Sequence, residues 1–140
     1  MPIYISQGRY TRDAIRGMTA KPEDRSRAAA KLLRDAGGKL LSHYLTFGEY
    51  DFLLVAEAPN EIAMASAVLA AGGTGGVADM RTTLALTPAD AMKAFEGART
   101  LAQSFQVAGA AGLATLGQGG RSEGGTPSPA RTRGGRVSTE

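Results

Sequence analysis

The stretch at residues 48–59 constrains the fold more than any other part of this chain. It reads GEYDFLLVAEAP, with a glycine that can open a turn, a Tyr-Asp pair, an apolar run and a closing proline. The run from Phe52 to Val55 lacks the polar alternation of a half-exposed strand, so it predicts a strand covered on both faces. We therefore expect it at the centre of a small sheet, with Tyr50 and Asp51 at its entrance.

Three other stretches alternate in the manner of strands, namely residues 2–10, 39–47 and 77–86. Gly48 and Glu49 predict a tight turn that joins residues 39–47 to the central run as a hairpin. These four stretches together predict a four-stranded sheet.

Capping residues and prolines predict helices between and after the strands, beginning near Thr11, Pro22, Asn60 and Thr87. Pro22 fits the first position of a helix, because the N–H that proline lacks has no intrahelical partner there. The helical segments that begin near Thr11 and Pro22 lie between the same two strands and count as one in this order. The order is then strand, helix, strand, strand, helix, strand, helix. This order predicts an α+β fold of the ferredoxin-like βαββαβ type, with an antiparallel four-stranded sheet and an extra C-terminal helix.

The composition changes near residue 105, so we expect a folded domain at residues 1–105 and a tail at 106–140. Residues 106–117 are rich in Ala and Gly and predict either a frayed helical extension or a partner-docking segment. Residues 118–140 consist mainly of Gly, Ser, Thr, Pro and Arg, and they are predicted to be disordered because they can bury little apolar surface.

The charge and the rare residue types exclude several classes of function. Two of the three net positive charges lie after Gln118, so the domain is nearly neutral and a nucleic-acid surface is not predicted. The chain has no cysteine and one histidine, which excludes thiolate chemistry and a His-rich metal site within one chain. The glycine run at residues 72–76 matches no phosphate-binding fingerprint and predicts a connector, so no cofactor is expected.

The chain shows no sign of secretion or membrane insertion. Its first residues lack the basic and apolar regions of a signal peptide. No stretch approaches the roughly 18–20 apolar residues that span a bilayer. We therefore expect a cytoplasmic protein without a membrane partner.

The predicted sheet needs a second covering layer. Two helices can cover one face of four strands, whereas large apolar residues are predicted on both faces. A second copy of the chain would cover the other face, so we expect a homodimer or a higher homo-oligomer formed through the sheet face.

His43 and Asp51 are the candidate catalytic residues. Alternation places His43 on the face of Leu41 and Leu45, opposite Leu40, and one strand away from Asp51. A His and an Asp that share a face could perform acid–base chemistry. The alternative is a histidine at a subunit or helix–sheet interface that is satisfied by a hydrogen bond.

Tyr44, Tyr50 and Arg81 are the candidate ligand-binding residues. The two tyrosines and Asp51 could form the polar lip of a pocket, or they could serve the turn and pack its rim. Arg81 could bind an anionic ligand, or it could pair with a nearby carboxylate.

The chain resembles the GYD domain family of small bacterial proteins across about residues 2–100. The name-bearing motif stands at residues 48–52 as GEYDF, with one residue between Gly and Tyr; further matching stretches are residues 2–11, 37–40, 57–59 and 81–84. The resemblance implies a ferredoxin-like α+β fold similar to the dimeric α+β barrel group. It implies no settled activity.

Three hypotheses for function follow. The first is a small-ligand-binding or regulatory homo-oligomer with a pocket beside the sheet. The second, by analogy with other dimeric α+β barrels, is a cofactor-independent enzyme for a small organic acid, in which His43 is the acid–base group, Asp51 or Tyr50 orients it, and Arg81 holds a carboxylate. The third is an interaction module that uses the arginine-rich tail.

Overall fold

A computed structural model describes residues 1–119 of the chain. Its helices and strands are, in order, β1 (Ile3–Tyr10), α1 (Arg12–Ala20), α2 (Arg25–Asp35), β2 (Lys39–Leu45), β3 (Phe52–Glu57), α3 (Glu61–Gly73), β4 (Val77–Ala85), α4 (Pro88–Ala102) and α5 (Ala110–Gly119). The chain divides into two units, Met1–Gly97 and Ala98–Glu140. The whole sheet lies in the first unit.

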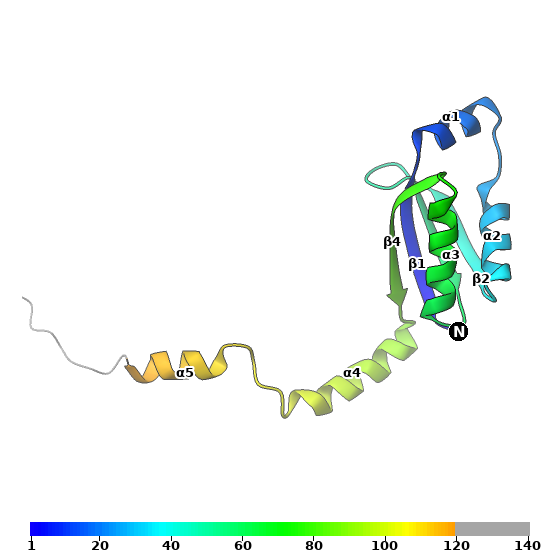
Figure 1. Ribbon diagram of the computed structural model, residues 1–140. Helices are drawn as coiled ribbons and strands as arrows, with labels where there is room; N and C mark the ends of the chain where they lie inside the picture. The colour runs from blue at the N-terminus through cyan, green and yellow to red at the C-terminus, as the bar shows by residue number, and fades with distance from the viewer. Residues whose placement is uncertain (120–140) are drawn as a thin grey trace, which may run out of the picture. The chain divides into compact units, whose positions relative to one another are not determined.

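The four strands form one antiparallel sheet in the order β2-β3-β1-β4 (Figure 1). This is the strand order of the ferredoxin-like fold, and it confirms the predicted α+β class. The stretch with the apolar run is β3, which pairs with β1 on one side and β2 on the other, so its predicted central position is also confirmed.

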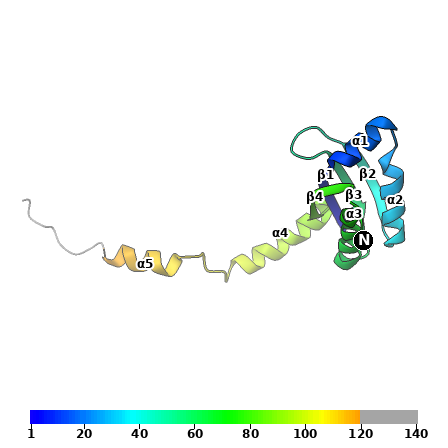
Figure 2. The same ribbon diagram turned by 45° about the horizontal axis from the view of Figure 1, so that its top comes forward.

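One face of the sheet carries the core of the first unit. In β1, Tyr4 and Ser6 are buried whereas the alternate residues Ile3 and Ile5 are half-buried, as the alternation of a strand requires. The buried side packs against α2 and α3, and the core cluster consists of Tyr4, Leu33, Ala56, Ala58, Met64 and Ala67. Figures 1 and 2 show α2 and α3 lying together against this face.

The predicted tight turn between β2 and β3 is wrong, because six residues separate the two strands. The connection is closed by Thr46, whose N–H donates to the Asp51 carbonyl at 2.8 Å. The Thr46 hydroxyl also donates to the Tyr50 carbonyl at 2.7 Å. These two bonds satisfy the backbone across a wider loop, in which Gly48 has a φ of 147°.

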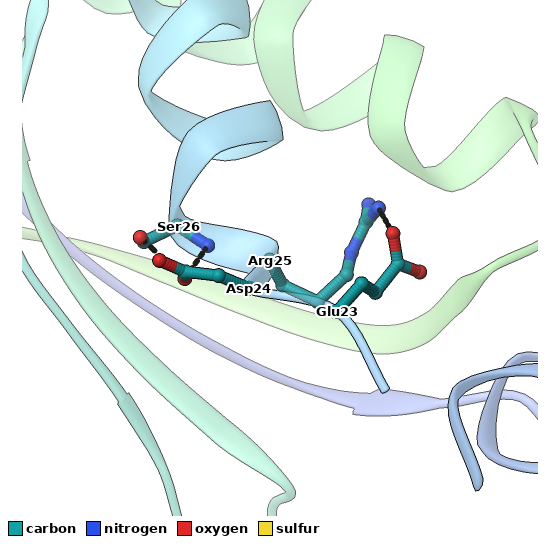
Figure 3. Close-up of polar contacts among 4 residues, drawn as sticks. All are labelled: Glu23, Asp24, Arg25 and Ser26. Atoms are coloured by element: carbon teal, nitrogen blue, oxygen red, sulfur yellow. Dashed lines mark hydrogen bonds and ion pairs between the residues drawn. The ribbon is translucent and has the colours of Figure 1, made fainter. Parts of the chain in front are cut away.

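The predicted start of α2 at Pro22 is also wrong, because the helix begins at Arg25. Asp24 is the N-cap: its Oδ1 accepts the Ser26 N–H at 2.9 Å and the Ser26 hydroxyl at 2.6 Å (Figure 3). The aspartate thus takes the capping role, and Pro22 lies outside the helix.

A bulge in β2 changes which residues share a face. Leu40 lies opposite Ala56 and His43 lies opposite Leu54. From the first pair to the second, the chain advances three residues in β2 but only two in β3. Directly opposed residues point to the same side of a sheet, so His43 lies on the helix-facing side with Leu40. The prediction that His43 and Leu40 lie on opposite faces of the sheet is wrong for this reason.

The predicted helix after β4 is present as α4. The Thr87 hydroxyl accepts the Asp90 N–H at 3.2 Å, as expected of a cap. The predicted disorder of residues 118–140 falls almost entirely outside the described part of the chain. Among the helices of residues 1–119, none has both the length and the apolar character that crossing a membrane would require.

Candidate functional site

A cavity of about 500 Å³ lies in the first unit, between the helix-facing side of the sheet and helices α1, α2 and α3. Small side chains on the helices create this space, because a methyl group reaches less far than the leucines and methionines around it. The alanines in the lining are Ala14, Ala28, Ala29, Ala67, Ala70 and Ala71. The sheet contributes a further small residue, Ser6, in the central strand β1.

The walls of the cavity are predominantly apolar. β3 contributes Phe52 and Leu54, and the larger apolar residues of the remaining walls are Met18, Leu32, Leu33, Met64, Val68, Val77 and Met80. A volume of this size falls within the range of roughly 300–1,000 Å³ found for small-molecule sites. The cavity is therefore large enough for a small organic ligand.

Helix α1 forms one wall with few fixed contacts. Ala14, Gly17 and Met18 line the cavity from this helix. None of the residues of α1 is buried, whereas α2 and α3 each bury residues in the core. This helix is therefore the least firmly packed part of the lining.

Most polar side chains in the lining already have a partner. The buried Ser6 hydroxyl lies 2.9 Å from the Thr82 hydroxyl, and the Thr74 hydroxyl donates to the Ala71 carbonyl at 2.7 Å. At the outer edge, Arg25 lies 3.6 Å from the Glu23 carboxylate, and about half of each side chain is exposed (Figure 3).

Tyr10 and His43 supply the remaining polar groups, and both lie beside Phe52. The ring centroids of Tyr10 and Phe52 are 5.2 Å apart, and those of His43 and Phe52 are 6.2 Å apart in an edge-on arrangement. Within residues 1–119, no fully buried side-chain N or O atom lacks a hydrogen-bond partner. The side-chain polar atoms of Tyr10 and His43 therefore have an exposed surface or a partner.

Burial sets the protonation of both groups. Burial is the main cause that raises the pKa of Tyr10, with Asp51 and Glu23 acting in the same direction and Arg25 against it. Burial is also the main cause that lowers the pKa of His43; Arg25 lowers it further and Asp24 opposes the change. At neutral pH the cavity thus holds a protonated phenol and a neutral imidazole.

Only one of the two candidate catalytic residues contributes to the cavity lining. His43 lines the cavity, but Asp51 lies outside its lining. The Asp51 Oδ2 accepts the Tyr10 N–H at 2.9 Å, and the Asp51 N–H donates to the Gly8 carbonyl at 2.8 Å. Asp51 therefore ties the loop before β3 to the end of β1.

The three candidate ligand-binding residues, Tyr44, Tyr50 and Arg81, lie outside the cavity lining. Tyr44 in β2 is opposite Leu53 in β3, and Arg81 in β4 is opposite Gln7 in β1. Both positions belong to the sheet face away from the helices, but β2 and β4 are the two edges of the sheet. Tyr50 lies in the loop between β2 and β3.

The sequence reasoning missed Tyr10 as a site residue. Its position two residues beyond Gly8, in register with Tyr4 and Ser6, was the available signal for the helix-facing side.

Among residues 1–119, no group of three His, Asp or Glu side chains is arranged to hold a metal ion.

Comparisons with known proteins show similarity to a domain family and to a relative from another organism. The family model of the GYD domain matches residues 4–95. A protein from Thermus thermophilus named "Glutamine synthetase and cystathionine beta-lyase binding protein" is 32% identical over 80 residues, which make up 57% of this chain and 84% of the relative.

Two solved structures are similar at low sequence identity. A protein from Thermus thermophilus has a TM-score of 0.38 and 16% identity, covering 62% of this chain and 95% of its own. A hypothetical protein from Pyrococcus horikoshii has a TM-score of 0.41 and 12% identity, covering 62% of this chain and 92% of its own.

Proposed function

The chain belongs to the GYD domain family, and on that premise we propose that it is a binding protein whose cavity between sheet and helices takes a small, largely apolar ligand. The observation that carries this proposal is the cavity of about 500 Å³ with its mainly aliphatic walls. Water in such a space contacts surfaces with which it cannot hydrogen-bond. Replacing it with an apolar molecule is favourable in proportion to the apolar area that the molecule buries.

The test is to fill the cavity with a side chain. Ala71→Phe places a ring in the space from α3, whereas the control Ala65→Phe adds the same ring at an exposed position of the same helix. Native mass spectrometry of the purified protein would reveal a bound small molecule, and a thermal-shift screen of apolar compounds would provide a second readout. We expect the wild type and Ala65→Phe to bind and Ala71→Phe to lose binding while it stays folded. Equal binding by all three proteins would contradict the proposal.

A second candidate function is the binding of an enzyme partner. It is favoured by the relative whose name states that it binds glutamine synthetase and cystathionine beta-lyase, since this chain covers 84% of that protein. The measurement is calorimetry of the full chain against purified glutamine synthetase and cystathionine beta-lyase from the same source. An absence of heat with both enzymes at two temperatures would exclude this candidate, because the binding enthalpy changes with temperature.

Self-association through the sheet face away from the helices is part of the same proposal. On the two central strands this face presents Ile3, Ile5, Leu53 and Val55, all half-buried in the single chain. A second copy would cover them and give a homodimer or a higher homo-oligomer. We place this assembly in the cytoplasm.

The enzymatic alternative has less support from the geometry. His43 lies in the cavity, but the Asp51 carboxylate is bound to the Tyr10 N–H and Arg81 lies on the other side of the sheet. This arrangement favours binding over acid–base chemistry by His43 and Asp51.

An interaction through the arginine-rich tail concerns residues that the structure does not describe.

A further inference from the structure

The cavity offers two polar groups to a ligand, and both are next to Phe52. The other hydrogen-bonding side chains of the lining are engaged, Ser6 with Thr82, Thr74 with a carbonyl, and Glu23 with Arg25. Tyr10 and His43 each place a ring against Phe52. The polar end of any bound molecule is therefore expected at this point.

We propose that the ligand is an uncharged, largely apolar molecule with one hydroxyl or carbonyl group, which lies beside Phe52 and hydrogen-bonds to the Tyr10 hydroxyl and the His43 imidazole. This inference rests on the proposed binding function and names the chemical class that the site selects. A phenol hydroxyl is a donor and an acceptor, and a neutral imidazole is a donor at one nitrogen and an acceptor at the other. Such a pair can satisfy both the hydrogen and the lone pairs of a ligand hydroxyl, or the lone pairs of a carbonyl.

The charges at the outer edge of the cavity argue against a charged ligand. The Arg25 guanidinium is paired with Glu23, and Asp24 next to it is fixed by two hydrogen bonds from Ser26 (Figure 3). An anionic group would share Arg25 with Glu23 and would lie near the carboxylates of Glu23 and Asp24. A cationic group would lie near Arg25. Either group would also lose its hydration against aliphatic walls, which is costly for an ion without a full set of partners.

Three probes of the same ring size test the inference on the full chain: naphthalene, 2-naphthol and 2-naphthoate. Their affinities can be measured at pH 7 by NMR titration of ¹⁵N-labelled protein. We expect 2-naphthol to bind roughly tenfold more tightly than naphthalene, because two hydrogen bonds are added. We expect 2-naphthoate to bind more weakly than 2-naphthol. Tighter binding of the carboxylate would overturn the proposed class while leaving the binding function intact, and no binding of any probe would contradict both.

Two variants assign the preference to named groups. Tyr10→Phe removes the hydroxyl alone and keeps the backbone N–H that donates a hydrogen bond to the Asp51 carboxylate. His43→Leu removes the imidazole. Each is expected to reduce the advantage of 2-naphthol over naphthalene by about threefold. Because the ratio of two affinities is measured on one protein, partial unfolding of a variant does not imitate the result. An unchanged ratio in both variants would overturn the role of these groups.

Discussion

His43 is the single histidine of the chain, so its titration can be followed without interference from another imidazole. Burial and Arg25 lower its pKa in the folded protein, against the opposing effect of Asp24. The unfolded chain, with a histidine pKa of about 6.5, then binds more protons than the folded protein as the pH falls. The stability contributed by the neutral imidazole is complete above that value, and it is lost as the pH drops through it toward the folded pKa.

This linkage predicts that the wild type loses stability between pH 7.5 and pH 5 and that His43→Leu loses less over the same interval. Urea unfolding at a series of pH values measures the two slopes. Most carboxylates have pKa values below this interval, so the difference between the curves isolates the histidine. Parallel curves for the two proteins would show that the pKa of His43 is not lowered by folding.

Asp51 makes a second prediction at the level of one residue. Asp51→Ala removes the acceptor of the Tyr10 N–H and is expected to destabilise the fold by about 1–3 kcal/mol. Asp51→Asn retains a side-chain oxygen and should recover most of this loss. Asp35→Ala is the matched control, because its exposed ion pair with Lys31 contributes no more than about 0.5 kcal/mol. If Asp51→Ala and Asp35→Ala have the same urea midpoint, the carboxylate does not hold the loop to β1.

At the scale of an element, α1 is the part of the cavity wall most easily displaced. It has no buried residue, although Ala14, Gly17 and Met18 line the cavity. Helices with few buried contacts open locally at low free-energy cost. We predict that amides of α1 exchange with deuterium faster than those of α3 in the free protein and that they become protected when 2-naphthol binds. Mass spectrometry of deuterated peptides measures both effects, and equal protection of α1 and α3 without ligand would contradict the prediction.

The elements themselves were largely predictable, and their junctions were not. Caps such as Asn60 and Thr87 act within a few residues, so local sequence identifies the helices that follow them. The start of α2 was misplaced because Pro22 and Asp24 both carry start signals, and only the hydrogen bonds to Ser26 decide between them. The face of His43 depends on a bulge, which arises from pairing with β3 and leaves no mark in the alternation of β2.

At the scale of the whole molecule, the order of strands and helices predicted the topology because few arrangements connect such elements without crossing. The cavity was not predictable in the same way. The space exists because the alanines of α2 and α3 have short side chains. In the sequence, an alanine at helical spacing is equally consistent with tight packing of the helix and with an open space beside it. Of the five candidate residues His43, Tyr44, Tyr50, Asp51 and Arg81, only His43 lies in the cavity lining.

The sheet face away from the helices supports the last prediction, which concerns the assembly. Val55 in β3 lies opposite Ile5 in β1, and these two strands are the central ones, so Val55 is at the middle of this face. It is half-buried in the single chain. Val55→Arg should be tolerated within one protomer, because the long side chain can reach solvent. In a homo-oligomer the same arginine would be buried without a partner, at a cost of about 3–5 kcal/mol, which weakens association by more than about a hundredfold.

Light scattering coupled to size exclusion, run over a range of protein concentrations, measures the mass. We expect the wild type to behave as a dimer or larger and Val55→Arg as a monomer with a similar circular dichroism spectrum. Ser66→Arg adds the same charge at an exposed position of α3 and should leave the mass unchanged. If the wild type is monomeric, the face has no second copy to cover it. If Val55→Arg keeps the mass of the wild type, association uses a different surface, since a buried unpaired arginine at this point cannot be accommodated without loss of affinity.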